Sequence, residues 1–348
     1  MANGIRKTYT GLDIGKFLCA LLILVYHYFS EHGPIPRILD EALSLYAVAV
    51  ALFMTISGFL TFDKLELIEG TKQRWKVVKK QVLRILTIYA IWSIPYLIYT
   101  VVRWDWGTIT LSFVAWQIQG WVFKQTFYTI WFMPALALGL VVTFWLTEKL
   151  IGWLVNTLAV IMYLVGSLTL TYSYFGDMIP GFSVFAEFAD TWLGGSRGWL
   201  FFAFPLLMIG RAMVKYKNKV KWSVMMCWSC IFVILILVEA LLLRRVAGHT
   251  GIDMTLMMVP SVYCILGFLI SVNIPEGKYC FWMRKMSTLI FMSQRLFLTI
   301  IPVCFPLVND IANNNNIIGM FIMCGPALIL SMIIILLSNR FKWLRLLY

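Results

Sequence analysis

Apolar runs of about 20 residues recur along the whole chain, and this feature most restricts what the chain can fold into. One of them, near residues 12–30, contains the stretch FLCALLILVYHYF from Phe17 to Phe29. A helix of about 20 apolar residues crosses the roughly 30 Å of hydrocarbon in a bilayer. Because backbone in lipid must satisfy its own hydrogen bonds, such runs form helices and not isolated strands. The runs therefore predict an all-α polytopic membrane protein.

Composition agrees with this class. Hydrophobic residues make up 61% of the chain and charged residues 13%, and the mean hydropathy is +0.84. A soluble domain has roughly 45–50% apolar and about 25% charged residues. No stretch is long and polar enough for a separate soluble domain, so residues 1–348 are predicted to form a single transmembrane domain. We place about ten spans, near residues 12–30, 43–62, 83–102, 127–147, 150–171, 199–214, 222–242, 254–272, 288–308 and 317–338.

The net charge of +13 is distributed unevenly along the chain. If the N-terminus is cytoplasmic, most Lys and Arg residues fall on cytoplasmic segments. The outer loops then keep only a few of them: Arg37, Arg103, Lys124, Arg197, Arg244 and Arg245. The positive-inside rule therefore predicts that both termini are cytoplasmic. The positive charge is a topology signal and does not indicate a nucleic-acid partner.

The first apolar run carries a stripe of polar residues, Asp13, Lys16 and His27. At 3.6 residues per turn, His27 lies only about 20° around the helix from Lys16, and Asp13 lies about 40° from His27 on the other side. Such a stripe faces a bundle interior or a water-filled cavity and avoids lipid. Asp13 and Lys16 are three residues apart and can pair. We expect a polar path from Lys16 near one end of the helix to His27 near the other.

Two interpretations of His27 remain open at this point. It is an interfacial ring hydrogen-bonded to a neighbouring helix, or it is a functional group. Imidazole is an effective general base near neutral pH, and a basic residue on the same stripe favours a catalytic role. The basic segment from Lys64 to Arg84 is open in the same way. It is a loop touching anionic lipid head groups, or it binds a phosphorylated ligand.

Several motifs together resemble the acyltransferase-3 family. GLDIGKFLCALLILVYH resembles its first helix, in which ten residues separate a basic residue from a histidine. ALFMTISGFL is similar to its second-helix signature, and KKQVLRILTIYAIW to its basic motif and third helix. TIWFMPAL and SRGWLFFAFPLLMIG resemble two later elements. These motifs occur in the family's order across essentially the whole chain.

The resemblance implies a bundle of ten helices in the bacterial cytoplasmic membrane. Such a protein takes an acyl group, usually acetyl, from a cytosolic acyl-CoA such as acetyl-CoA. It transfers the group to a hydroxyl of an extracytoplasmic sugar, glycan or cell-envelope polymer. Matched by position, His27 becomes the general base and Lys16 its basic partner, with Asp13 on the same stripe. Arg84 stands where the family binds the CoA phosphates, with Lys79 and Lys80 beside it and Arg74 on the same basic segment; no metal is implied.

Other matched positions carry less defined roles. Ser57 either packs between helices or acts in catalysis, and Trp131 matches a motif position with no derived role. Arg197 and Arg295 are candidates to hold an anionic substrate or an oxyanion. We expect Arg295 to face the cavity, towards Glu239 or a substrate, because an unpaired charge within a span is costly.

Two positions depart from the family pattern. The family's Arg-x-x-Arg pair reads here as Gln81 and Arg84, and Gln294 stands at or near the place of a second histidine. Direct transfer and an acyl-histidine intermediate both fit the residues. The membrane half of vancomycin-resistance serine racemases is also similar, and it implies an alternative, a proton-coupled importer of a small polar solute such as serine. A third possibility is a structural partner in envelope polysaccharide synthesis.

Overall fold

The structure, a computed structural model, is a bundle of helices described for residues 8–31, 42, 45–123, 130–248, 252–314 and 316–348. Within these residues, nine helices are long and apolar enough to cross a membrane. They are α1 (Thr10–Glu31), α3 (Tyr46–Leu65), α4 (Thr71–Val102), α6 (Phe132–Lys149), α7 (Gly152–Thr169), the π-helical turn η1 (Trp199–Ala203) continuing into α10 (Phe204–Tyr216), α11 (Trp222–Ala247), α13 (Lys278–Cys304) and α15 (Asn316–Leu337). A tenth apolar helix, α12 (Met258–Ser271), is shorter. The prediction of an all-α polytopic membrane protein is confirmed.

Two helices begin well before the predicted spans. α4 starts at Thr71 and α13 at Lys278, whereas the apolar runs suggested starts near residues 83 and 288. Hydropathy detects only the apolar part of a helix, and both helices extend towards their N-termini as basic, amphipathic segments. These extensions carry Lys80 and Arg284 to the same part of the molecule.

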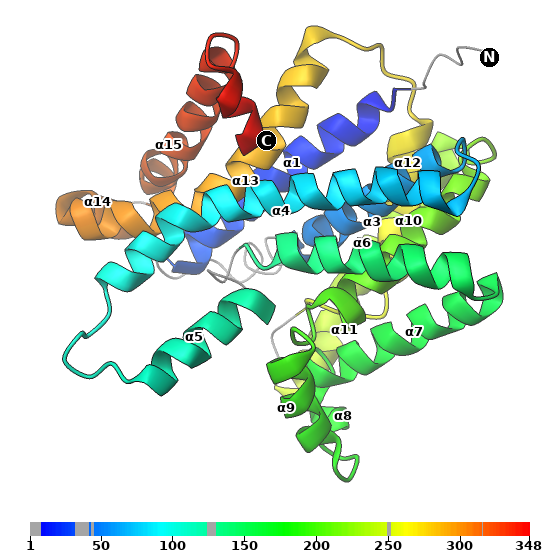
Figure 1. Cartoon of the computed structure of the whole chain (residues 1–348), viewed down its shortest axis with the longest axis horizontal. Coiled ribbons are helices and arrows are strands. Elements are labelled where there is room, and N and C mark those ends of the chain that lie inside the picture. Colours follow the sequence, from blue (N-terminus) through cyan, green and yellow to red (C-terminus); the bar gives the residue numbers. More distant parts are fainter. Residues whose placement is uncertain (1–7, 32–41, 43–44, 124–129, 249–251, 315) are drawn as a thin grey trace.

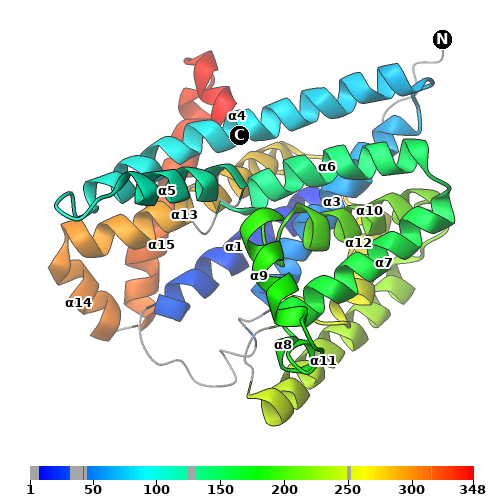
Figure 2. The same ribbon diagram turned by 60° about the horizontal axis from the view of Figure 1, so that its bottom comes forward.

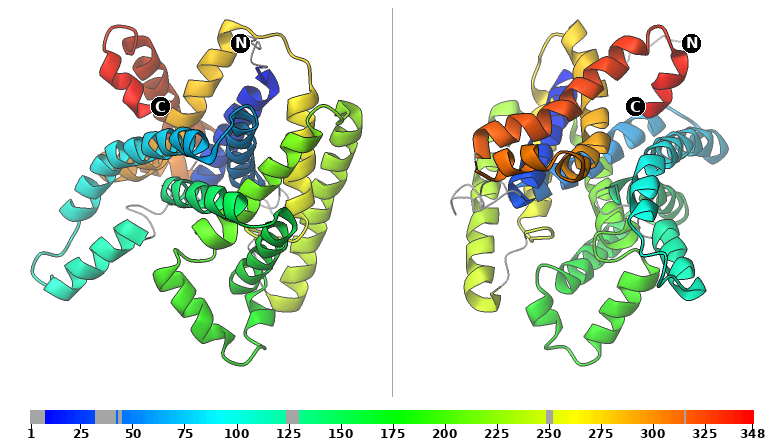
Figure 3. Two further views of the ribbon diagram at one scale, coloured as in Figure 1. Left: turned by 45° about the vertical axis from the view of Figure 1, so that its right-hand side comes forward. Right: turned by 90° about the vertical axis from the view of Figure 1, so that its left-hand side faces the viewer.

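Shorter helices connect the spans: α5 (Leu111–Phe123), α8 (Ser173–Gly176), α9 (Phe182–Trp192), α14 (Pro306–Asn314) and the 3₁₀ segment η2 (Lys342–Leu347). Figure 1 shows α5 and α9 away from the central helices, and both views of Figure 3 show the same segments projecting from the bundle. η2 returns to the bundle, where the indole nitrogen of Trp92 in α4 donates a hydrogen bond to the carbonyl oxygen of Leu347 (3.1 Å).

α1 lies among other helices. It packs along α13 and also contacts α3, α12 and α15. Figure 2 shows α1 with α13 on one side and α3 on the other, and α4 and α6 running past them. The polar side chains of α1 therefore face protein, as the stripe predicts. We name the two ends of this helix the Asp13 end and the His27 end.

α3 and α10 cross at two glycines. A Cβ atom on Gly58 would lie 2.5 Å from the carbonyl oxygen of Leu207, and one on Gly210 would lie 2.2 Å from that of Thr55. Only hydrogen fits at either position, and small residues of this kind let helix backbones approach closely in membrane proteins. Gly58 belongs to the second-helix motif ALFMTISGFL, so this motif lies at the crossing of the two helices.

Candidate active site

A cavity of about 850 Å³ lies between α1, α3, α4, α6 and α13. Five of the residues singled out in the sequence line it together: Asp13, Lys16, Ser57, Lys80 and Arg84. They come from three helices that are distant in sequence. The structure thus brings the first-helix stripe, the second-helix motif and the basic third-helix motif to one space.

Cations dominate the charged part of the cavity wall. Six basic residues line it, and Asp13 and Asp63 are the acidic ones. The six are Lys16, Lys64, Lys80, Arg84, Arg284 and Lys285. Gln81, which stands at one position of the family's Arg-x-x-Arg pair, lines the cavity as well. A wall of this kind attracts an anionic ligand.

The partner of Asp13 is Arg284 of α13, not Lys16. The guanidinium donates two hydrogen bonds, from Nε to Oδ1 at 2.9 Å and from Nη2 to Oδ2 at 2.6 Å. A bidentate pair of this kind is strong and fixes both side chains. The predicted Asp13–Lys16 pair is therefore wrong as a hydrogen bond, although the two charges still attract each other. Lys16 makes no hydrogen bond to another described residue and lies on the cavity wall.

Two predicted phosphate-binding residues do not line the cavity. Lys79 is exposed on the opposite face of α4. Arg74 forms an ion pair with Glu148, whose other oxygen accepts a 2.6 Å hydrogen bond from the Thr71 hydroxyl. Arg74 therefore joins α4 to the end of α6 and does not face the cavity.

Two tyrosines outside the membrane-spanning helices also line the cavity. Burial and the nearby Asp63 carboxylate raise the pKa of Tyr9 above its ordinary value. At Tyr348 burial acts in the same direction, but hydrogen bonding with Lys285 and Ser338 outweighs it and lowers the pKa. The Tyr348 hydroxyl is held 2.9 Å from Ser338 Oγ at the edge of the cavity.

Three phenylalanines close the far end of the cavity. Phe53, Phe132 and Phe291 come from α3, α6 and α13 and all line it. Their ring centroids lie 6.0 Å (Phe53–Phe132), 5.8 Å (Phe53–Phe291) and 5.4 Å (Phe132–Phe291) apart. We call this group the phenylalanine triad. Ser57 lies one turn from Phe53 on α3, and its hydroxyl donates a hydrogen bond to the Phe53 carbonyl oxygen (2.8 Å).

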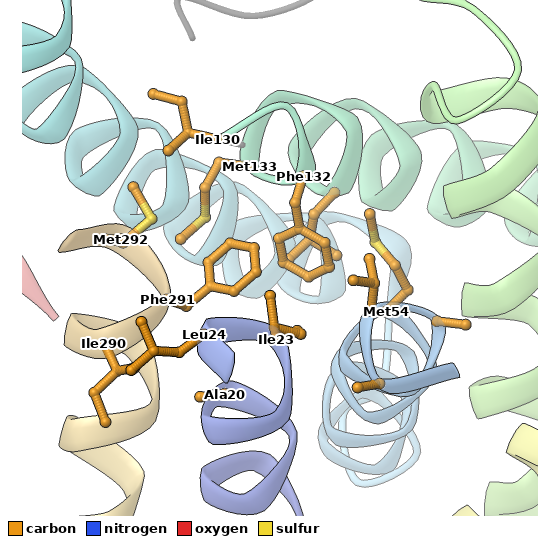
Figure 4. Close-up of a cluster of buried hydrophobic side chains, with 14 of the residues drawn as sticks. Ala20, Ile23, Leu24, Met54, Ile130, Phe132, Met133, Ile290, Phe291 and Met292 are labelled. Carbon is orange, nitrogen blue, oxygen red and sulfur yellow. The ribbon is translucent and has the colours of Figure 1, made fainter. Parts of the chain in front are cut away.

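His27 is not part of this cavity. Between Lys16 and His27, the face of α1 presents Ala20, Ile23 and Leu24, all buried. Figure 4 shows these side chains packed beside Phe291 and Phe132. The continuous polar path predicted along α1 is therefore wrong, because an apolar layer separates its two polar ends.

His27 lies instead in an aromatic and charged cluster at its own end of α1. Its half-buried ring lies 5.5 Å from that of Tyr26 and 6.1 Å from that of Tyr46, centroid to centroid. The Tyr26 and Tyr46 rings stack at 3.7 Å. The imidazole makes no hydrogen bond to another described residue. The interpretation of His27 as a structurally hydrogen-bonded ring thus has no support within the described part of the chain.

Asp253 organises the surroundings of His27. It accepts a 2.8 Å hydrogen bond from the Tyr46 hydroxyl at Oδ1 and forms a 2.8 Å ion pair with Arg197 at Oδ2. Arg197, a candidate substrate ligand, is therefore neutralised by a carboxylate in this structure. Its side chain is still 41% exposed, which leaves part of the guanidinium accessible.

Arg295 is buried in α13, but its expected partner is wrong. It forms an ion pair with Glu31 at the His27 end of α1, and it does not line the cavity. Glu239 instead accepts hydrogen bonds from the backbone nitrogens of Leu256 (2.6 Å) and Met257 (2.9 Å), just before and at the start of α12. The Tyr172 hydroxyl also donates to Glu239. Glu239 thus holds the segment that leads into α12.

Trp131 and Gln294 are two further positions that were compared with the family motifs. Trp131 lies at the start of α6, where its ring packs 5.8 Å from that of Phe202 and 6.4 Å from that of Phe132. Gln294 is fully buried, and neither amide atom has a hydrogen-bond partner among the described residues.

Sequence reasoning missed several residues of the site. Arg284 and Lys285 lie far from α1 in the sequence, so no local pattern links them with that helix. Both are basic residues near the start of a later span. Tyr46 and Asp253 gave no motif signal. Phe53 and Phe132 lie within two of the quoted motifs, ALFMTISGFL and TIWFMPAL, but only the packing of α3, α6 and α13 shows that they meet Phe291.

In addition to this geometry, the chain has recognisable relatives. It is 23% identical to an amino-acid racemase of Enterococcus faecalis over 95% of this chain and 47% of the relative. A second amino-acid racemase of the same organism is 22% identical over 97% of this chain and 46% of the relative. The chain thus spans about half the length of these curated relatives. No solved structure matches it.

The family comparison covers more of the chain than any single motif. Residues 9–336 match the acyltransferase-3 family model, described as an acyltransferase domain. The matched region includes every described cavity residue except Thr8 and Tyr348. The chain is a multi-pass membrane protein of helical fold, and it belongs to the acyltransferase-3 family.

Proposed function

We propose that this acyltransferase takes an acyl group, most simply acetyl, from a cytosolic acyl-CoA. It passes the group to a hydroxyl of an extracytoplasmic sugar, glycan or cell-envelope polymer. The observation that carries the proposal is the cavity, which is cationic at the Asp13 end and apolar at the phenylalanine triad.

The wall of the cavity fits an acyl-CoA as donor substrate. Its nucleotide part carries several phosphate charges, which Lys and Arg side chains bind through charge-assisted hydrogen bonds. Lys80, Arg84 and Arg284 supply such donors, and Lys16 adds a cation with no hydrogen-bond partner among the described residues. The apolar end of the cavity suits the pantetheine arm and a short acyl chain. One ligand with a charged head and an apolar tail thus matches both halves.

The orientation of the chain in the bacterial cytoplasmic membrane is part of the proposal. With the Asp13 end cytoplasmic, the basic starts of α4 and α13 face the cytosol, as the positive-inside rule favours. The donor then enters from the cytosol, and the acceptor reaches His27 from outside. Anionic lipid head groups neighbour the basic residues on the cytoplasmic side.

The proposed chemistry is acyl transfer with proton removal by His27. The acceptor hydroxyl oxygen attacks the thioester carbonyl carbon, and His27 takes the hydroxyl proton. The new ester C–O bond forms, the C–S bond breaks, and the CoA thiolate leaves and is protonated. Asp253 and Tyr46 hold the surroundings of the ring, and the exposed part of Arg197 is placed to interact with an anionic or hydroxyl-rich acceptor.

Proteoliposomes containing the purified protein test the proposal directly. Labelled acetyl-CoA should be consumed in the presence of an envelope glycan, and Lys80→Gln and Arg84→Gln should each raise KM for acetyl-CoA about tenfold by removing a phosphate partner. Lys76→Gln is the matched control, because Lys76 is an exposed lysine of the same helix outside the cavity.

The same vesicles test the alternative drawn from the racemase relatives. Uptake of labelled serine without turnover of acetyl-CoA would contradict the proposal and support the importer. Equal KM values for the wild type and for both cavity variants would contradict the assignment of the donor site.

A further inference from the structure

We infer that the phenylalanine triad limits the length of the acyl chain that the enzyme transfers. This inference rests on the proposed acyl-CoA donor. It assigns to Phe53, Phe132 and Phe291 a role in substrate specificity that none of the sequence motifs indicates.

The three rings of the triad form a continuous surface at one end of the cavity. Its members come from three different helices, and the three centroid distances lie between 5.4 and 6.0 Å, so that each ring contacts the other two. Two of the three pairs are edge-to-face, an arrangement favoured by the charge distribution of aromatic rings. All three rings face the cavity, and Phe132 and Phe291 are only 5% and 7% exposed.

Closely packed side chains of the same hydrophobic core adjoin the triad. Ile23 and Leu24 of α1, with Met54 of α3, are at most 1% exposed. Figure 4 shows Ile23 and Leu24 next to Phe291, and Met54 near Phe132. Protein interiors are packed at nearly crystalline density, and each added methylene must displace neighbouring side chains.

Because the cationic end of the cavity fixes the position of the donor, the triad at the other end limits the length of its acyl chain. A donor whose phosphates are bound near Lys80 and Arg84 places its thioester at a depth set by the fixed length of its pantetheine arm. Carbon atoms added to the acyl group then extend towards the triad. Leu24 lies three residues before His27, a rise of roughly 4.5 Å. The tip of an acyl chain that stops at the triad is thus about one helical turn from the His27 end.

The test compares donors of different length in single-residue variants. For the wild type and for Phe291→Ala, kcat/KM is measured with acetyl-, butyryl- and hexanoyl-CoA in proteoliposomes. The hexanoyl-to-acetyl ratio should be low in the wild type and rise about tenfold or more in the variant, since one methylene in an apolar pocket changes kcat/KM about 10- to 200-fold. A ratio is independent of the amount of folded protein, so partial misfolding does not mimic the effect.

Matched variants exclude general loosening of the bundle. Phe144 lies in α6, the helix that also carries Phe132, is fully buried and does not line the cavity, so Phe144→Ala should leave the ratio unchanged. Phe53→Ala and Phe291→Leu provide milder changes if Phe291→Ala fails to fold, because Phe53 is only half-buried and leucine retains most of the volume.

The outcomes separate this inference from the proposed function. The triad does not limit acyl-chain length if the wild type transfers acetyl groups but no triad variant changes the hexanoyl-to-acetyl ratio of kcat/KM. The same conclusion follows if Phe144→Ala changes that ratio equally. If folded triad variants lose transfer from every donor, the rings have another role and the inference is also wrong. If the wild type turns over no acyl-CoA of any length, the proposed donor itself is wrong.

Discussion

At the residue scale, His27 is a half-exposed side chain without a hydrogen bond of its ring among the described residues. His27→Ala therefore removes the ring contacts with Tyr26 and Tyr46 but no hydrogen bond of the imidazole to a described residue. We expect it to abolish acyl transfer, lowering kcat by at least about 10²-fold as the loss of a general base does. Membrane insertion and the thermal midpoint should be nearly unchanged, as measured by transfer assays and thermal unfolding in detergent; transfer at a near wild-type rate would remove His27 from the mechanism.

Gln294 shows the opposite combination, full burial with both amide atoms unpaired among the described residues. Burying an unsatisfied polar group costs about 1–3 kcal/mol. Gln294→Met retains the length of the side chain and removes that cost. We expect the variant to be more stable by about 1 kcal/mol, measured by thermal unfolding of the purified protein. A loss of stability would mean that the amide has a partner in the folded protein.

At the element scale, the crossing of α3 and α10 depends on Gly58 and Gly210. A Cβ atom on Gly210 would lie 2.2 Å from the Thr55 carbonyl oxygen and 2.5 Å from the Phe59 nitrogen, both backbone atoms. Gly210→Ala must push the helices apart, and we expect a loss of about 1–3 kcal/mol in the free energy of unfolding. The second-helix motif, with Ser57 on the cavity wall, would move with α3, so KM for the donor should rise as well.

Gly120 supplies the control for this helix crossing. It lies in α5, and no atom of the described residues lies within 4 Å of an added Cβ. Gly120→Ala should be neutral or stabilising by up to about 1 kcal/mol, because alanine is the better helix former. Equal destabilisation of both variants would show that backbone contact at Gly210 is not the cause.

At the scale of the whole molecule, the expected orientation determines which loops meet each side of the membrane. Lys72 at the start of α4 and Asp105 after α4 are both exposed and lie at opposite ends of that helix. In a variant without native cysteines, an impermeant thiol reagent should label Asp105→Cys in intact cells. Lys72→Cys should be labelled only after permeabilisation. The reverse pattern would invert the proposed path of donor and acceptor.

The helices themselves were predictable because a bilayer imposes length and polarity on every span. The start of α13 was not, since the segment that carries Arg284 is polar and escapes a hydropathy window. Side-chain partners were harder still. Asp13 sits three residues from Lys16 yet binds Arg284, which is 271 positions away. Local periodicity gives the angle of a side chain around its own helix, but not the helix that packs against it.

The same limit explains the error over the polar stripe. Helical periodicity placed Asp13, Lys16 and His27 on one face correctly, but it did not show that Ile23 and Leu24 fill the middle of that face with apolar volume. The five motif residues that line the cavity could be identified from the sequence because the motifs were considered together. Tyr46 and Asp253 were not, since one tyrosine and one aspartate have no distinctive spacing.

The ion pairs Asp13–Arg284 and Glu31–Arg295 both join α1 to α13, one towards each end of α1. Two helices fastened at two separated points can neither slide nor hinge apart without breaking a charge pair. Any widening between the donor space and His27 must then come from the helices that carry Phe53 and Phe132. The two arginines therefore join α1 and α13 into one unit, which contributes Phe291 to the wall of the cavity.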